Sequence, residues 1–378
     1  STTYTPNVTP VTPTAEPAET TDIQGKEQTG KPEFKPGNPE VPMDDEVPAT
    51  FEDGSTTKTI PGEGTYTVDP DGTVHFTPDP QFKGKGTTMT VVRKDQNGTP
   101  VTAEYTAVVH PVSPEGTEVE TAGVQGKVQS GKPNFIGGKA EVNGVEKTVD
   151  IDETKPAKLI DPKTGQPVDS VTIDGEGTYT VNPETGEVTF TPDKQFTGKG
   201  TPIKVQRKDT NGTPVTADYT AVVVPADPEG DDVTTADIQG AEQSGTPQFH
   251  GGKANIDGVE KEVPIDETVP AKLIDPTTGQ EVDEVVADEG TYRVDPDGTV
   301  HFKPKPDFVG KAKGITVKRV DTNGTPATGT FTPTVVGTSP KAEPSISSDI
   351  QGQTQEQPVK FTGGSAVVKD PVTGAKTE

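Results

Sequence analysis

The sequence predicts an all-β protein in which antiparallel, immunoglobulin-like β-sandwich units follow one another in an elongated rod. The tripeptide Gly-Thr-Tyr stands at residues 64–66, 177–179 and 290–292, so successive copies are 113 residues apart. Between the copies, short runs of alternating polar and apolar residues are separated by turn residues, and this pattern is typical of β-sandwiches. No sustained 3.6-residue apolar period occurs, so nothing predicts a helix.

Two further markers recur along the chain. Asp-x-Asn-Gly-Thr-Pro stands at residues 95–100, 209–214 and 321–326, and Gln-Gly stands at 24–25, 125–126, 239–240 and 351–352. The chain is therefore a tandem array, and its function should follow from what one unit gains by being copied in line. An active site gains little from such copying, whereas a spacer gains length with every copy.

The second half of each unit predicts two β-hairpins. In the middle unit, residues 178–181 and 187–191 alternate polar and apolar side chains on either side of a Pro/Gly turn. A strand predicted at 203–207 then leads through Asn211-Gly212 into a last strand at 215–224. Asn-Gly accepts the positive φ of a tight hairpin turn, so we expect these turns to be exposed to solvent.

The first half of each unit is less definite. Residues 140–142, 147–149 and 157–160 each predict a short strand. The first unit is about twelve residues shorter than the others, and the segment 161–167 has no good counterpart after Phe51. We therefore expect a hairpin to be trimmed there.

The junctions between units keep a constant length. The interval of 21 residues from Tyr4 to Gly25 returns between Tyr105 and Gly126, Tyr219 and Gly240, and Phe331 and Gly352. Flexible linkers tolerate insertions at little cost, so equal intervals predict packed connections and restricted hinges.

Both ends of the chain fall inside repeats, which predicts a piece of a longer array. The expected division is residues 1–21 for the end of a preceding repeat and a Pro/Thr-rich junction, 22–121 for a trimmed first repeat, 122–235 and 236–347 for the second and third, and 348–378 for the truncated start of a fourth.

Composition excludes several classes of function. A net charge of −26 makes nucleic acid an unsuitable partner, because phosphate binding needs clustered Lys and Arg. Only 27% of the residues are apolar, with 39 Pro and 42 Gly, so each core must be thin. The chain has no Cys, and we find no transmembrane stretch, secretory signal or sorting motif in it. Neither a membrane nor a cofactor is therefore expected as a partner.

Four aspartates are the best candidates for a metal site. Asp69 and Asp71, like Asp295 and Asp297, flank a proline before a turn glycine and suggest a weak calcium loop. The EF-hand pattern, however, needs more acidic ligands and flanking helices. The simpler interpretation is a turn in which each Asp side chain bonds its own backbone.

No catalytic constellation emerges. Four His and no Cys cannot supply a repeated zinc site, and no nucleophile-elbow, phosphate-binding or dinucleotide pattern occurs. We therefore expect no enzyme. The recurring Tyr and Phe positions fit buried cores better than a sugar-binding stripe. A Lys–Asn crosslink through Asn97, Asn211 or Asn323 is disfavoured by their predicted exposure.

The ordered combination of these motifs resembles a known family. Residues 62–78, Gly-Glu-Gly-Thr-Tyr-Thr-Val-Asp-Pro-Asp-Gly-Thr-Val-His-Phe-Thr-Pro, followed by Phe82-Lys83-Gly84 and the Asp-x-Asn-Gly-Thr-Pro turn, are similar to the CshA-type fibril repeat of streptococcal and related wall-anchored adhesins. The resemblance covers essentially the whole chain. It brings no catalytic or binding residues with it.

This resemblance implies a structural stalk on the surface of a Gram-positive cell. The stalk would be anchored to peptidoglycan by a sorting signal outside this sequence. It would project a separate region that binds host matrix such as fibronectin. The alternative is that the repeats themselves bind a host glycoprotein, or join cells in a biofilm, through many weak copies.

Overall fold

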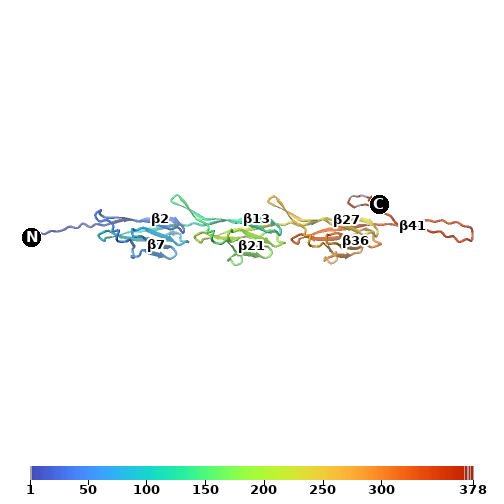
Figure 1. Ribbon diagram of the computed structural model, residues 1–378, viewed down its shortest axis with the longest axis horizontal. Helices are drawn as coiled ribbons and strands as arrows, with labels where there is room; N and C mark the ends of the chain where they lie inside the picture. Colours follow the sequence, from blue (N-terminus) through green and yellow to red (C-terminus); the bar gives the residue numbers. More distant parts are fainter. Residues whose placement is uncertain (1, 370, 373, 375, 378) are drawn as a thin grey trace.

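The computed structural model describes residues 2–369, 371–372, 374 and 376–377, and every regular element in this part is a strand. Three β-sandwich units lie in line and form a rod (Figure 1). The predicted all-β fold and tandem arrangement are therefore confirmed. No helix in the described part is long and apolar enough to cross a membrane.

The middle unit shows the architecture that the others share. The first sheet consists of β13 (Val119–Val124), β25 (Pro214–Val224), β24 (Ile203–Lys208), β18 (Lys158–Ile160), β19 (Pro167–Val168) and β23 (Gly198–Lys199). The second sheet consists of β14 (Gln129–Gly131), β22 (Val188–Pro192), β21 (Gly177–Val181) and β20 (Ser170–Ile173). Two small pairs complete the unit: β12 (Glu115–Thr117) with β15 (Asn134–Ile136), and the hairpin of β16 (Gly138–Val142) and β17 (Val145–Val149).

The third unit repeats this order. The first sheet consists of β27 (Val233–Ile238), β39 (Pro326–Val336), β38 (Ile315–Val320), β32 (Lys272–Ile274), β33 (Glu281–Val282) and β37 (Gly310–Lys311). The second sheet consists of β28 (Gln243–Gly245), β36 (Val300–Pro304), β35 (Gly290–Val294) and β34 (Glu284–Val286). The small pairs are β26 (Glu229–Gly230) with β29 (Phe249–His250), and β30 (Gly252–Ile256) with β31 (Val259–Val263).

The first unit is a shorter version of the same sandwich. The first sheet consists of β2 (Ala18–Ile23), β11 (Pro100–His110), β10 (Met89–Lys94), β5 (Thr50–Phe51) and β9 (Gly84–Lys85). The second sheet consists of β3 (Gln28–Gly30), β8 (Val74–Pro78), β7 (Gly64–Val68) and β6 (Thr57–Ile60). The small pair is β1 (Thr14–Glu16) with β4 (Glu33–Lys35). Beyond the third unit, β40 (Lys341–Glu343) pairs with β41 (Lys360–Thr362), and β42 (Val368–Lys369) pairs with β43 (Lys376–Thr377).

One pair of strands in each unit departs from the antiparallel prediction. β13 runs parallel to β25, and β2 with β11 and β27 with β39 do the same. Because the first long strand and the last strand run in the same direction, the chain begins each unit at one end and leaves it at the other. Alternation within single strands carries no information about pairing over so long a separation, so the sequence did not reveal this pair.

The recurring aromatic residues form the cores, as predicted. Tyr179 and Phe190 face each other across β21 and β22, with ring centroids 4.3 Å apart, and Tyr219 meets Tyr179 edge-on at 6.2 Å. All three side chains are fully buried. Phe196, from the Gly-rich bend, packs beside them and is partly buried. A few large rings therefore compensate for the low apolar content.

A polar tie joins the two sheets where the chain passes from one to the other. Thr121 of β13 donates its hydroxyl to Gln129 Oε1 of β14 at 2.8 Å, and Gln129 Nε2 donates to the Val222 carbonyl at 3.0 Å. Tyr219 Oη lies 2.9 Å from the Thr121 hydroxyl. The first and third units repeat the Thr–Gln bond. Each buried Gln is thus satisfied at both ends of its amide.

The first unit is trimmed in two places rather than one. After Phe51, a tight turn closed by Gly54 N–H to the Phe51 carbonyl (2.9 Å) replaces the β18–β19 turn, as expected. In addition, the place of the β16–β17 hairpin is taken by a short turn with a bridge between Asn38 and Val41. The two strands of this hairpin were predicted in the middle unit at 140–142 and 147–149, but its absence from the first unit was not predicted.

Strand pairing also divides the chain differently from the expected boundaries. The boundaries drawn before residues 22, 122 and 236 fall inside β2, β13 and β27. Each of these strands pairs along its whole length within the unit that follows. The units meet instead in the Pro-rich segments 111–114 and 225–228. Recurring motifs show the length of one repeat, but they do not show at which residue each folded unit begins.

The cores make a direct prediction for stability. Phe190→Ala should destabilise the middle unit by about 3–5 kcal/mol, because it empties a fully buried aromatic site in a thin core. Val145→Ala, at a side chain that is 58% exposed, is the control and should change stability by no more than about 0.5 kcal/mol. Denaturant unfolding measures both. A loss below about 1 kcal/mol for Phe190→Ala would contradict the packing described.

Candidate functional site

The junction between successive units is the feature that a line of copies adds to a single unit. At the second junction, the Asn-Gly turn between β38 and β39 meets the Gln-Gly turn that follows β13. Asn323 Nδ2 donates to the Gln125 carbonyl at 3.0 Å, and Gln195 Nε2 donates to the Asn323 carbonyl at 2.9 Å. Asn323 is only 8% exposed. Two units are thus joined by hydrogen bonds between their end loops.

The first junction repeats the same contacts. Asn211 Nδ2 donates to the Gln24 carbonyl at 3.0 Å, and Gln81 Nε2 donates to the Asn211 carbonyl at 2.9 Å. Gln81 Nε2 also lies 3.2 Å from the Thr213 hydroxyl. Because both junctions use equivalent atoms, this arrangement is a property of the repeat.

Glycine is required in the Gln-Gly turn. Gly126 has φ +74°, and a Cβ added to it would lie 2.0 Å from Asn323 Oδ1; Gly25 meets Asn211 in the same way. The absent side chain therefore forms the space that the Asn amide occupies. Gly240, the equivalent residue of the third unit, has φ +84° with nothing within 4 Å of its added Cβ.

A protruding hairpin adds apolar contacts to each junction. In Figure 1, the β16–β17 and β30–β31 hairpins extend from their own units over the preceding ones. Val142 and Val149 pack with Ile23 and with Val112 of the connecting segment. At the second junction, the corresponding cluster contains Val124, Ala226, Ala254 and Val263. Burial of these side chains supports the predicted packed connection.

The same hairpin also appears after the third unit. Val368 of β42 is 7% exposed, and β42 packs against β27. Gly364, Gly252 and Gly138 occupy one position, where an added Cβ would lie within 3 Å of the connecting segment's backbone. The segment that follows the third unit therefore also packs against the unit before it.

The two complete junctions differ in charge. At the first, Lys147 Nζ lies 2.6 Å from Asp22 Oδ2. At the second, Gly123 replaces the aspartate, and among the described residues Lys261, the equivalent lysine, forms no ion pair. A groove of about 770 Å³ runs there between β13 and the β30–β31 hairpin, compared with about 350 Å³ at the first junction.

The expected exposure of the Asn-Gly turns is wrong for two of the three copies. Asn97 is exposed, but Asn211 is half-buried and Asn323 is buried in the junctions. The sequence showed these turns only as hairpin signals. Nothing in the sequence around Gln81 and Gln195 marks them as partners of these turns. The one available indication was that Gln-Gly recurs after a strand in every unit although no role within the unit explains it.

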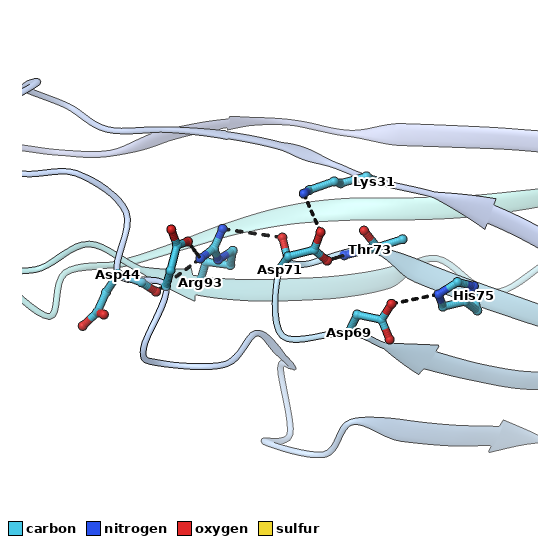
Figure 2. Close-up of polar contacts among 8 residues, drawn as sticks. Lys31, Asp44, Asp69, Asp71, Thr73, His75 and Arg93 are labelled. Atoms are coloured by element: carbon cyan, nitrogen blue, oxygen red, sulfur yellow. Dashed lines mark hydrogen bonds and ion pairs between the residues drawn. The ribbon is translucent and has the colours of Figure 1, made fainter.

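The calcium candidates lie in the β7–β8 and β35–β36 turns, where Lys, Arg or His side chains and backbone N–H groups contact their carboxylates. Asp71 Oδ2 lies 2.7 Å from Lys31 Nζ and Asp69 Oδ2 lies 3.0 Å from His75 Nε2, as Figure 2 shows. Asp71 also accepts a bond from the Thr73 N–H at 2.9 Å, the backbone bond expected of such a turn.

The equivalent turn in the third unit is similar. Asp295 accepts from Arg293 at 2.9 Å and lies 2.8 Å from His301, while Asp297 accepts from the Thr299 N–H at 2.9 Å. No group of three or more His, Asp or Glu side chains is placed to hold a metal in the part of the chain that the structure describes.

A buried arginine lies behind each of these turns. Arg93, 7% exposed, donates to the Asp71 carbonyl at 3.5 Å (Figure 2). It also pairs with Asp45 at 2.7 Å. Arg207 and Arg319 take the same place and are also buried. A guanidinium this close occupies a turn carbonyl and repels a second cation, so the turn is organised around Arg.

The Gly-to-Ala pair at equivalent positions tests the junction. Gly126→Ala and Gly240→Ala carry the same strain of about 1–2 kcal/mol from positive φ, but only Gly126→Ala also displaces Asn323. Because the chain has no Cys, spin labels on Lys163→Cys and Val286→Cys report the distance between the second and third units. We expect Gly126→Ala alone to broaden this distance distribution. Equal distributions would contradict the proposed role of the glycine.

The turn ion pair predicts an acid titration. The bond from Lys31, followed by that from the Thr73 N–H, lowers the pKa of Asp71 below its ordinary value of 3.8. A lowered carboxyl pKa stabilises the folded unit above the unfolded value, and this contribution is lost as pH falls through the folded value. Lys31→Gln should raise the pKa of Asp71, measured by carboxyl NMR. Lys35→Gln, which affects a different pair, should leave it unchanged.

The chain was compared with protein families, curated proteins and solved structures. Residues 10–109, 111–223 and 225–335 each match the family described as the surface adhesin CshA repetitive domain. No curated protein matches the chain. Among solved structures, the I9–I11 tandem of titin is similar at 13% identity and a TM-score of 0.31, covering 86% of this chain and 97% of that one.

Mouse cadherin-23 EC22–24 is similar at 15% identity and a TM-score of 0.28, covering 87% of this chain and 100% of that one. The family match spans most of the sequence in three consecutive copies and confirms the resemblance found in the motifs. The chain therefore belongs to the CshA repetitive-domain family and is the repeat region of a cell-surface adhesin.

Proposed function

We propose that these repeats form a non-enzymatic stalk, which projects a separate host-binding region away from the cell. The observation that carries this proposal is the pair of equivalent junctions, in which Asn211 and Asn323 dock into the preceding unit. Packing of this kind restricts bending, so added units extend the reach of the array. Each unit, with its end loops, contributes on the order of 40 Å.

The surface of the array supports this role. A net charge of −26 makes neighbouring stalks repel each other and keeps them soluble. The recurring aromatic side chains, which could have formed a sugar-binding stripe, are buried or partly buried in the cores. On this proposal, attachment to peptidoglycan in a Gram-positive, streptococcal-type wall and binding to matrix such as fibronectin belong to other regions of the adhesin.

The stalk proposal is tested by asking whether adhesion depends on the length of the array or on the identity of its units. In a cell-displayed adhesin, deletion of units should lower adhesion, because a shorter stalk leaves the binding region among the wall polymers. Replacement of the deleted units by unrelated β-sandwiches of equal length and rigidity should restore adhesion. The measurement is attachment of cells to a matrix-coated surface under flow.

The competing role, adhesion by the repeats themselves, makes the opposite prediction. The equal-length replacement would then fail to restore adhesion, and the purified array would bind the coated surface by itself. Either result would overturn the stalk proposal.

A further inference from the structure

Three chemically equivalent Asn-Gly turns lie in three different environments. Asn97 is exposed, Asn211 is half-buried at the first junction, and Asn323 is buried at the second. The turns themselves are alike, since the glycine N–H donates to the carbonyl of the preceding aspartate at 2.8–2.9 Å in each. Docking is therefore the main difference between them.

Asn-Gly is the dipeptide most open to spontaneous deamidation, because glycine offers no side chain to hinder attack by its backbone nitrogen. In this reaction the glycine nitrogen bonds to the Asn Cγ and loses its proton. The Cγ–Nδ2 bond breaks, and Nδ2 leaves as ammonia. Water then opens the resulting succinimide to aspartate or isoaspartate. Water is consumed and ammonia released, without any change of oxidation state.

We propose that the Asn-Gly turns are deamidation sites that docking protects, so that a junction is chemically altered only while it is open. In the docked state, Asn323 Nδ2 is held by the Gln125 carbonyl and the Asn323 carbonyl by Gln195. The side chain lies against Gly126, and turning its amide toward the Gly324 nitrogen would break the bond to Gln125. Attack at Cγ therefore requires the turn to leave the junction first.

Deamidation would prevent the junction from closing again. The group that donates to the Gln125 carbonyl would become a carboxylate oxygen, which cannot donate and carries a negative charge into a buried position. Isoaspartate would also add one backbone atom to the turn. A junction held open for long would thus remain flexible. Protection by docking does not depend on which region the array displays.

The first test compares deamidation rates within one folded molecule. Gln96→Thr gives the first turn the same hexapeptide, Asp-Thr-Asn-Gly-Thr-Pro, as the other two. After incubation in mildly alkaline buffer, peptide mapping by mass spectrometry follows all three sites. We expect Asn97 to deamidate at least about tenfold faster than Asn323, with Asn211 between them, because opening must precede attack at the docked sites.

Two controls show whether docking or the local sequence determines the deamidation rate. In denaturant, the three identical hexapeptides should react at one rate. In the folded chain, Gln195→Ala removes a contact to Asn323 and should speed its deamidation several-fold while leaving Asn211 unchanged. Gln81→Ala should do the reverse. Equal rates for Asn97 and Asn323 in the folded chain, or no response to either Gln variant, would overturn the protection by docking.

The second test concerns the product. Asn323→Asp places the carboxylate in the second junction directly, and it should broaden the distance distribution between spin labels on the second and third units. Asn97→Asp, at the exposed copy, is the matched control and should leave it unchanged. A narrow distribution in Asn323→Asp would overturn the proposed loss of docking.

Discussion

The parallel pairing of the first long strand with the last strand decides where the chain begins and leaves each unit. β13 and β25 run side by side in the same direction and end together, at Val124 opposite Val224. The Gln-Gly turn and the connecting segment consequently emerge at the same end of the sandwich. The following unit must stack on that end. An antiparallel closure would return the chain to its starting end and give a different assembly.

The junctions add apolar contacts to units with thin cores. With 27% apolar residues, each sandwich depends on a few buried rings. Val124 shows how the two are combined, because it ends β13 and packs with Val263 of the following unit's hairpin. Each hydrogen bond at the junction contributes about 0.5–1.5 kcal/mol, so several together restrain a hinge that one alone would not.

Much of one unit could be predicted from sequence, but little of the contact between units. Alternation located the strands around Tyr179 and Phe190, and the Asn-Gly turn located the last hairpin. These signals are local. The parallel strand pair and the contact of Asn323 with Gln125 each join residues about 100 to 200 positions apart in the sequence. The residue at which each unit begins depends on the same distant pairing. Recurrence alone shows that such residues matter to each unit, not which partner they meet.

Tension along the rod acts on the parallel pair in a particular direction. Pulled from its ends, a unit is loaded at the start of β13 and at the end of β25, so the two strands are drawn past each other. Their paired residues, from Val119 opposite Tyr219 to Val124 opposite Val224, then bear the load together rather than one after another. The junction contacts at Asn323 and Gln195 instead lie on small end loops and involve few bonds. Extension should therefore open junctions before it opens sandwiches, which leaves the cores intact while the array bends.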